Sequence, residues 1–328
     1  MNLVTLLALA GSPQTRGYDV YFEQNNGIYV LQPNGTILPV LQHARSSAIS
    51  PDGKSLACWR NRDLILFNIA GKRVSAIAKN ALGNADLYDR IPPPSWLPAS
   101  QTVVAARSEK VRLTYQATSN DKDRTRNKST INVWSIYRYK PMRNVKKGWD
   151  SDYFLSTDDS GVSAFSLTSS STPSASPDGK AIAFCQNGDL WIAEPTSDDN
   201  GFFSNPASAS EQRIAAGNTQ EKLGAGSQTS FIYRISWSPS SKLIAYYEDR
   251  YTSGGNYTIT VGKVVRNNDG YISLNKIATI HGANPVFVDE KTILYDSSSR
   301  GPDLRSFNLN SKTDQLLLKN GKFPVIVR

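Results

Sequence analysis

The chain has 328 residues, of which 39% are hydrophobic, and a formal net charge of +9 at pH 7. A chain of this length can hold one large domain or two ordinary ones and can bury a substantial core. It contains no apolar run of roughly 18 residues, so we expect no membrane span, and its two cysteines cannot form a disulfide framework.

Residues 1–17 precede the first predicted strand. Residues 3–11 are apolar and include the spacing Ala8-x-Ala10, as in the second half of a secretory signal peptide, although the usual basic segment is missing. We expect residues 1–17 to be a signal-peptide remnant or a disordered N-terminus; a stray first strand is the other interpretation. A signal-peptide remnant predicts a periplasmic or secreted protein, with residues 18–328 as its single domain.

The rest of the chain alternates short apolar runs, rich in Val, Ile, Tyr, Phe and Trp, with turns of Pro, Gly, Ser and Asn. No run shows a sustained helical stripe, which predicts an all-β fold. In chain order the predicted strands are 18–22, 28–31 and 37–41; 46–49, 55–60, 64–69 and 74–78; 94–98, 102–106, 131–139 and 153–156; 173–176, 181–185, 190–193 and 213–216; 234–238, 243–247, 257–265 and 274–280; 284–288, 292–295, 304–308 and 315–318; and 323–327.

One turn recurs in this pattern. Residues 50–54 and 176–180 both read Ser-Pro-Asp-Gly-Lys, and residues 238–242 are a degraded copy. Pro presets φ, Asp bonds the backbone two residues on and Gly accepts a positive φ, which suits a tight turn between antiparallel strands. Turns repeated at this spacing indicate a repeat fold, with four strands in each unit, as in the blade of a β-propeller.

The strand count predicts how the ring closes. The first unit has only three strands, and residues 323–327 form a strand without a unit. Adding this strand to the first unit gives a six-bladed β-propeller of four-stranded antiparallel blades, closed by its C-terminal strand, with no open sheet edge. A seven-bladed ring and an open β-solenoid are the alternatives.

Residues 172–184 followed by Asp189-Leu190-Trp191-Ile192-Ala193 resemble the repeat of TolB-type propellers, and residues 47–69 and 235–247 resemble it less completely. This resemblance implies a six-bladed propeller fold and favours a protein of the cell envelope. The same repeat occurs in propeller-bearing peptidases, but those need a hydrolase domain with a G-x-S-x-G elbow, and this chain has neither.

Motifs for catalysis are missing. His43 and His281 are the only histidines and fall in predicted links between blades, so we expect no catalytic triad. The sequence has no cluster of His and Cys residues that would predict a zinc site. The Asp-rich loops at 121–123 and 198–201 lack the later Glu of an EF-hand calcium loop. We therefore predict no catalytic, cofactor-binding or metal-binding residues. Cys58 and Cys185 are expected to be free and buried.

The positive charge is concentrated in the third predicted unit. Twelve of the 37 Lys and Arg residues, but only three of the 28 acidic residues, lie between positions 107 and 147, so this segment alone carries +9. The segment is also predicted to form an over-long hairpin in which aromatic residues are interleaved with the cations. Cationic and aromatic side chains together favour binding of an anionic partner. The predicted partner-binding residues are Lys122, Arg124, Arg126, Lys128, Trp134, Tyr137, Arg143, Lys146, Lys147 and Trp149. A solvated hairpin without a partner is the simpler alternative.

We therefore expect a monomeric, non-catalytic scaffold that binds an acidic protein or an anionic glycan or other polymer; nucleic acid is less favoured. The alternatives are an enzyme of the lactonase or sugar-dehydrogenase type with a metal in the channel, and a glycan-binding propeller. In each, the first strand of every blade should line the channel. The candidate channel contacts are Arg45, Ser46, Ser95, Ser174, Arg234 and Asn284.

Overall fold

The computed structural model describes residues 17–80, 91, 93–96, 103–114, 128–140, 150–153, 173–186, 189–195, 209–215, 230–250, 257–268, 272–297 and 302–326. These residues form β-strands joined by turns, arranged as six four-stranded antiparallel sheets. The prediction of an all-β propeller built from four-stranded antiparallel blades is confirmed. In this described part of the chain, no helix is long and apolar enough to cross a membrane.

The strands follow the predicted order. Sheet 1 contains β1 (Val20–Gln24), β2 (Gly27–Leu31), β3 (Ile37–Gln42) and β24 (Lys322–Ile326). Sheet 2 contains β4 (Ala44–Ile49), β5 (Ser55–Arg60), β6 (Asp63–Asn68) and β7 (Arg73–Ala78). Sheet 3 contains β8 (Ser95–Trp96), β9 (Val103–Thr114), β10 (Lys128–Lys140) and β11 (Asp150–Tyr153).

The remaining sheets repeat the same plan. Sheet 4 contains β12 (Ser174–Ala175), β13 (Ile182–Gln186), β14 (Asp189–Pro195) and β15 (Ala209–Ala215). Sheet 5 contains β16 (Ser230–Trp237), β17 (Leu243–Arg250), β18 (Tyr257–Arg266) and β19 (Ile272–His281). Sheet 6 contains β20 (Ala283–Phe287), β21 (Thr292–Asp296), β22 (Leu304–Asn308) and β23 (Asp314–Leu318).

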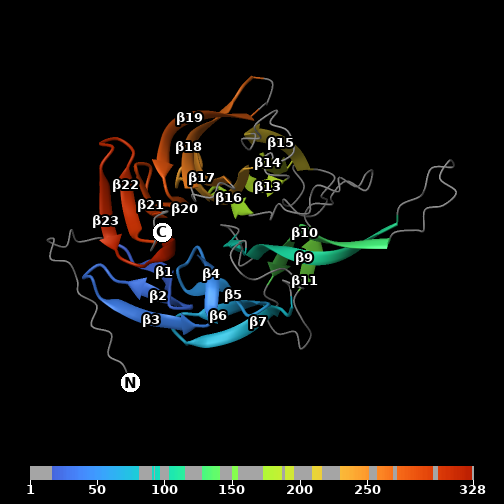
Figure 1. Cartoon of the computed structure of the whole chain (residues 1–328), viewed down its shortest axis with the longest axis horizontal. Helices are drawn as coiled ribbons and strands as arrows, with labels where there is room; N and C mark the ends of the chain where they lie inside the picture. Colours follow the sequence, from blue (N-terminus) through green and yellow to red (C-terminus); the bar gives the residue numbers. More distant parts are fainter. Residues whose placement is uncertain are drawn as a thin grey trace.

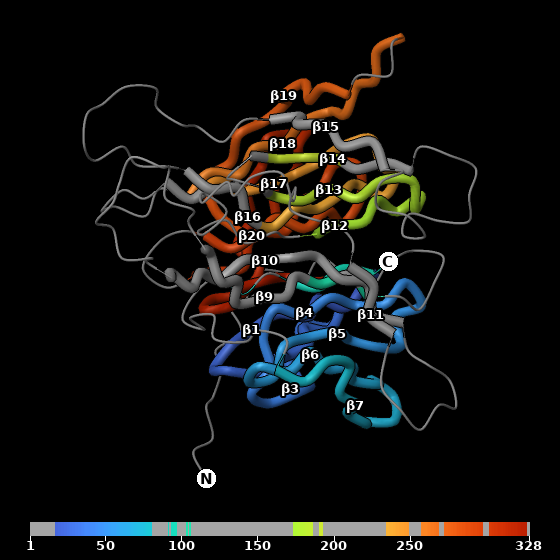
Figure 2. Tube along the Cα trace, turned by 90° about the vertical axis from the view of Figure 1, so that its right-hand side faces the viewer, coloured from blue at the N-terminus to red at the C-terminus, as the bar shows by residue number. Residues whose placement is uncertain are grey.

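The sheets follow one another around a central axis in chain order (Figure 1). Their innermost strands contact one another in a closed circle that runs β24, β4, β8, β12, β16, β20 and back to β24. β24 pairs with β1, so the end of the chain completes the sheet that the beginning of the chain starts, as the strand count predicts. Viewed from the side, β1–β7 occupy the lower half of the molecule, and β13, β14 and β17–β20 the upper half (Figure 2).

The apolar core lies between neighbouring sheets. Trp59, Leu64 and Trp96 pack in one cluster that joins sheets 2 and 3. Other clusters join sheets 1 and 2, 4 and 5, 5 and 6, and 6 and 1. Cys58 and Cys185 are buried in this core and neither forms a disulfide, as the sequence predicts for both. Sheets 1, 2, 5 and 6 are therefore each stabilised by burial of both faces against their neighbours.

The recurring turn has the geometry that its sequence predicts. In the first copy Asp52 Oδ1 accepts hydrogen bonds from Ser50 Oγ (2.6 Å) and the Lys54 N–H (3.0 Å), and Gly53 has φ = 70°. The second copy repeats this arrangement with Asp178 as acceptor, at 2.6 Å from Ser176 Oγ and 3.1 Å from the Lys180 N–H. These bonds hold the first and second strands of a sheet in register.

The degraded copy allows a matched test of backbone strain. Gly179 has φ = 71° with no atom within 4 Å of where a Cβ would lie, whereas Ser241 holds the corresponding conformation, φ = 61°, at a non-glycine residue. A left-handed conformation costs an L-residue about 1 kcal/mol. Gly179→Ala should therefore lower the free energy of unfolding by about 1 kcal/mol. Ser241→Gly relieves the strain but also removes the hydrogen bond from the Asp178 N–H to Ser241 Oγ (3.1 Å), so its loss should be the smaller of the two. Urea denaturation of both variants measures this; equal losses in the two would contradict it.

Innermost strands are also joined by polar contacts that alternate in kind. The indole N–H of Trp96 donates to the carbonyl of Ala48 (3.1 Å), and that of Trp237 donates to the carbonyl of Ser174 (2.9 Å). At the sheet boundaries in between, Ser95 Oγ accepts from the Ala175 N–H (3.0 Å) and Ser236 Oγ from the Phe287 N–H (3.1 Å). A run of four consecutive boundaries is thus closed next to the axis by a hydrogen bond.

Sheet 3 departs from the others. β9 has 12 residues and β10 has 13, the two longest strands that the structure describes, and they pair from Val103↔Tyr139 to Thr114↔Lys128. This hairpin extends well beyond the ring (Figure 1). The prediction of an over-long hairpin is confirmed, although the sequence placed the two strand ends at Ala106 and Ile131. Residues 107–110 are Arg-Ser-Glu-Lys, a polar run that interrupts the apolar pattern, which is why the predicted strand ends at Ala106.

Candidate functional site

The candidate site is a cavity of about 330 Å³ on the propeller axis, lined by the innermost strands of all six sheets. One position of the repeat recurs around its wall and is occupied by Ala48, Ser95, Ser174, Ser236, Val286 and Val325. The wall also contains Pro94, Pro173, Pro285 and Pro324. The cavity is therefore mostly apolar, with a few hydroxyl groups, as is usual for small-molecule sites.

Four of the innermost strands carry a bulge at the same point. The register shifts beside Ser46, Arg234, Asn284 and Phe323, and these residues have φ of 48°, 36°, 54° and 55°. Positive φ is costly for non-glycine residues and is concentrated at functional sites, where a bulge re-aims a side chain. The four bulges belong to four different sheets, and their residues meet at the axis.

Two acidic residues replace core residues beside these bulges. In each sheet the residue of the innermost strand that lines the cavity pairs with a residue of the neighbouring strand. The residue two positions further along that neighbouring strand is Trp59 in sheet 2, Cys185 in sheet 4 and Tyr247 in sheet 5. Sheets 1 and 6 have Glu23 and Asp296 at this position. Both carboxylates are buried, with exposed fractions of 6% and 5%. Buried acids at positions that otherwise hold aromatic or apolar side chains need compensating partners.

The partners come from the bulges. Glu23 Oε1 accepts a short hydrogen bond from the N–H of Ser46 in the next sheet. Asp296 Oδ2 accepts from Asn284 Nδ2 at 2.8 Å. Arg234 lies over the ring of Phe323, with Cζ 4.5 Å from the ring centroid, and is itself only 7% exposed. Residues of sheets 1, 2, 5 and 6 thus form one buried polar cluster, made of Glu23, Ser46, Arg234, Asn284, Asp296 and Phe323.

Burial and neighbouring charges shift the pKa values of the groups in this cluster in opposite directions. Burial raises the pKa of Asp296 to about 7, although the bond from Asn284 and the charge of Arg234 both act to lower it. Burial likewise raises the pKa of Glu23 against the opposing effect of Arg234. The pKa of Arg234 is lowered by burial, while Glu23, Asp296 and Tyr247 favour its charged form. Arg234 is therefore the buried cation that compensates the two acids.

The arrangement extends the site beyond the channel residues predicted from the sequence. Ser95, Ser174 and Arg234 do line the cavity, and Ser46 and Asn284 belong to the polar cluster. Arg45 is exposed and donates to Asn26 Oδ1 at 3.3 Å, outside the cluster. Glu23, Asp296 and Phe323 were missed. The repeat holds the signal for the two acids: once the strands are paired, Glu23 and Asp296 occupy the position that Trp59, Cys185 and Tyr247 occupy in sheets 2, 4 and 5.

The predicted partner-binding residues fall in sheet 3. Lys128, Trp134 and Tyr137 lie on β10, where Trp134 pairs with Ser108 and Tyr137 with Ala105. The other seven lie outside the described residues: Lys122, Arg124, Arg126, Arg143, Lys146, Lys147 and Trp149. Binding by this set therefore remains a prediction.

Among the described residues, no group of three or more His, Cys, Asp or Glu residues is placed to hold a metal ion. His43 lies between β3 and β4, where its Nδ1 is 3.2 Å from Asn26 Nδ2. The loops at 121–123 and 198–201 lie outside the described residues. What the axial cluster does provide is a buried cation beside an apolar cavity, an arrangement suited to holding an anion.

The chain is similar to several solved structures, but it matches no family model or curated protein. Among solved structures it is similar to a putative TolB from Agrobacterium tumefaciens, at 14% identity over 93% of this chain and 90% of that one, with a TM-score of 0.48. An oligogalacturonate lyase from Vibrio parahaemolyticus is 10% identical over 92% and 79% of the two chains, with a TM-score of 0.49.

A third similar structure is the periplasmic gluconolactonase PpgL from Pseudomonas aeruginosa, at 10% identity over 95% of this chain and 99% of that one, with a TM-score of 0.47. A TolB is among these structures, so the resemblance to TolB-type propellers that residues 172–193 predict is found again among solved structures. With TM-scores below 0.5 these similarities carry no further argument about this chain, and its assignment as a propeller rests on its own six sheets and the contacts between their innermost strands.

Proposed function

We propose that this protein is a non-catalytic binding scaffold, which recognises an acidic protein or another anionic polymer through the basic hairpin of sheet 3. One observation carries the proposal. The segment that contains the whole net charge of the chain, residues 107–147, is also the segment whose strands run out beyond the ring (Figure 1). A cationic arm on a rigid scaffold attracts anionic partners over about a Debye length.

The scaffold itself supports this role. We propose that each of the six sheets is one blade of a closed six-bladed ring, since the innermost strands contact one another all the way round. Such a ring has no open edge and presents its loops from fixed positions. The hairpin is then anchored at its base by Trp96, which is buried in the core between sheets 2 and 3.

The proposal predicts salt-dependent retention on an anionic matrix. Reversal of Lys122, Arg124, Arg126, Arg143, Lys146 and Lys147 to Glu should move elution from heparin and from immobilised polyglutamate to clearly lower salt, because electrostatic retention depends on these charges. The matched control reverses six exposed lysines on other sheets: Lys54, Lys72, Lys180, Lys276, Lys312 and Lys319. Elution that shifts equally in both variants would reject the hairpin as the binding element.

The main alternative is an enzyme with a cation in the channel. Oxygen atoms of Glu23, Asn284 and Asp296 favour it, since carboxylate and amide oxygens bind hard cations. The guanidinium of Arg234 opposes it, because it already supplies positive charge to the same acids. Elemental analysis of the purified protein separates the two functions: a stoichiometric divalent metal would support the enzyme. We also propose an extracytoplasmic location, which cell fractionation tests.

A further inference from the structure

We propose that the axial cavity binds a carboxylate, with the guanidinium of Arg234 and the hydroxyl of Ser47 as its hydrogen-bond donors. This site is distinct from the basic hairpin of sheet 3 and does not depend on the function proposed for it. The ligand class is a carboxylate attached to a small apolar body, either as a free organic acid or as the C-terminus of a peptide.

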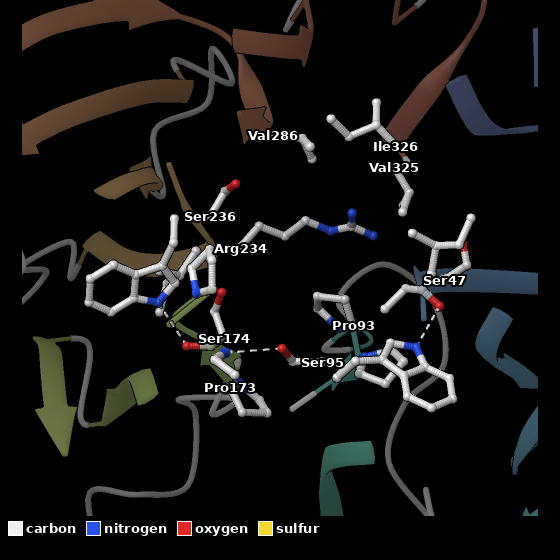
Figure 3. A pocket seen from close by; sticks show the side chains of 18 of the residues that line it. Ser47, Pro93, Ser95, Pro173, Ser174, Arg234, Ser236, Val286, Val325 and Ile326 are labelled. Carbon is white, nitrogen blue, oxygen red and sulfur yellow. Dashed lines mark hydrogen bonds between the residues drawn. The ribbon is translucent and has the colours of Figure 1, made fainter. Parts of the chain in front are cut away.

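Two buried donors without a partner carry this inference. Arg234 Nη2 and Ser47 Oγ each have no hydrogen-bond partner among the described residues, and both residues line the cavity. Arg234 is 7% exposed and Ser47 3%. Figure 3 shows the Arg234 side chain running across the cavity from sheet 5 toward the side of Ser47 and Val325. A buried donor left unsatisfied is costly, so an acceptor that enters the cavity would gain both bonds.

The chemistry of the donors selects the ligand. A guanidinium nitrogen and a hydroxyl match a carboxylate, whose two oxygens can each accept several hydrogen bonds. The neighbouring wall is apolar: Pro285, Val286, Pro324 and Val325 come from the two sheets between Arg234 and Ser47. A cavity of about 330 Å³ leaves room for the head group and a body the size of a benzene ring. A fully polar anion such as phosphate would leave this wall without a partner.

The two acids of the cluster do not use up the hydrogen-bonding capacity of the Arg234 guanidinium. Glu23 accepts from the Ser46 N–H and Asp296 accepts from Asn284, so each has a polar partner other than the guanidinium. With Asp296 protonated, the cluster of Glu23, Arg234 and Asp296 is neutral and an added carboxylate meets no net repulsion. Lys322 adds a further positive charge that acts on Glu23. Because the pKa of Asp296 is raised to about 7, binding should be tighter at pH 6 than at pH 8.

Calorimetry with defined probes tests the proposal. Benzoate should bind the wild-type protein, and benzamide, which has the same shape without the charge, should bind at least tenfold more weakly. A tripeptide with a free C-terminus, compared with its C-terminal amide, distinguishes the two ligand sources: tighter binding of the free-acid tripeptide than of benzoate identifies a peptide terminus, and the reverse identifies a free acid.

Variants locate the site. Ser47→Ala should weaken benzoate binding several-fold, whereas Ser75→Ala, which removes an exposed hydroxyl from β7, should not. Arg234→Met is made together with Glu23→Gln and Asp296→Asn, so that no uncompensated charge stays buried, and should abolish binding; Asp296→Asn alone, which keeps the oppositely charged Glu23 and Arg234, should retain it. The proposal fails if wild type binds no carboxylate at pH 6, if benzamide binds as well as benzoate, or if the triple variant binds like wild type.

Discussion

Replacing Arg234 with methionine is expected to lower the free energy of unfolding at pH 7 by about 3–5 kcal/mol, because removing one partner of a buried charge cluster leaves the other charges uncompensated. Arg234 is 7% exposed, and its charge acts on both Glu23 and Asp296. Its guanidinium also lies over the ring of Phe323. Chemical denaturation followed by tryptophan fluorescence measures the loss.

Two further variants separate lost charge from lost packing. The triple change Glu23→Gln, Asp296→Asn and Arg234→Met removes all three charges together and should recover most of the stability, since replacing a whole buried charge cluster is often near neutral. Arg234→Lys keeps a cation and should fall between the single and triple variants in stability. An Arg234→Met protein within about 1 kcal/mol of wild type would show that the guanidinium does not compensate the two acids.

The sequence predicted the strands well wherever local chemistry determines them. Residues 50–54 and 176–180 form the expected turns because each hydrogen bond of the turn joins residues five or fewer apart. The same locality explains why the fold class could be read from turn spacing. The closure of sheet 1 by β24 also followed, since only one strand was left without partners once the turns had been counted.

The axial cluster was harder to predict because it depends on which residues face one another across sheets. Glu23 is the second-last residue of β1 and Asp296 is the last residue of β21, and nothing in either local sequence marks them as buried. That these two acids occupy the same position of the repeat as Trp59, Cys185 and Tyr247 becomes visible only once the pairing of each innermost strand with its neighbour is known. The bulges beside Ser46, Arg234 and Asn284 obscure that pairing in the sequence, because each bulge shifts the register between the two strands. Arg234 itself was predicted because it enters an innermost strand directly.

The acid cluster should also give the protein an unusual pH dependence. The pKa of Asp296 rises from its ordinary 3.8 to about 7 on folding, so between these values the folded state keeps a proton that the unfolded state releases. The contribution of Asp296 to stability is therefore fully present below about pH 4 and is lost as pH rises through about 7. Each pKa unit corresponds to about 1.4 kcal/mol, so the effect is on the order of a few kcal/mol.

Asp296→Asn isolates this effect, since the new amide can still accept from Asn284 but cannot ionise. Measured by urea denaturation from pH 4 to pH 8, wild type should lose stability relative to this variant as pH rises. Asp52→Asn is the control of opposite sign: Ser50 and the Lys54 N–H lower the pKa of Asp52, so its contribution is present above about pH 4 and is lost on acidification. A wild-type curve parallel to that of Asp296→Asn would mean that Asp296 is ionised throughout, with Arg234 outweighing the cost of burial.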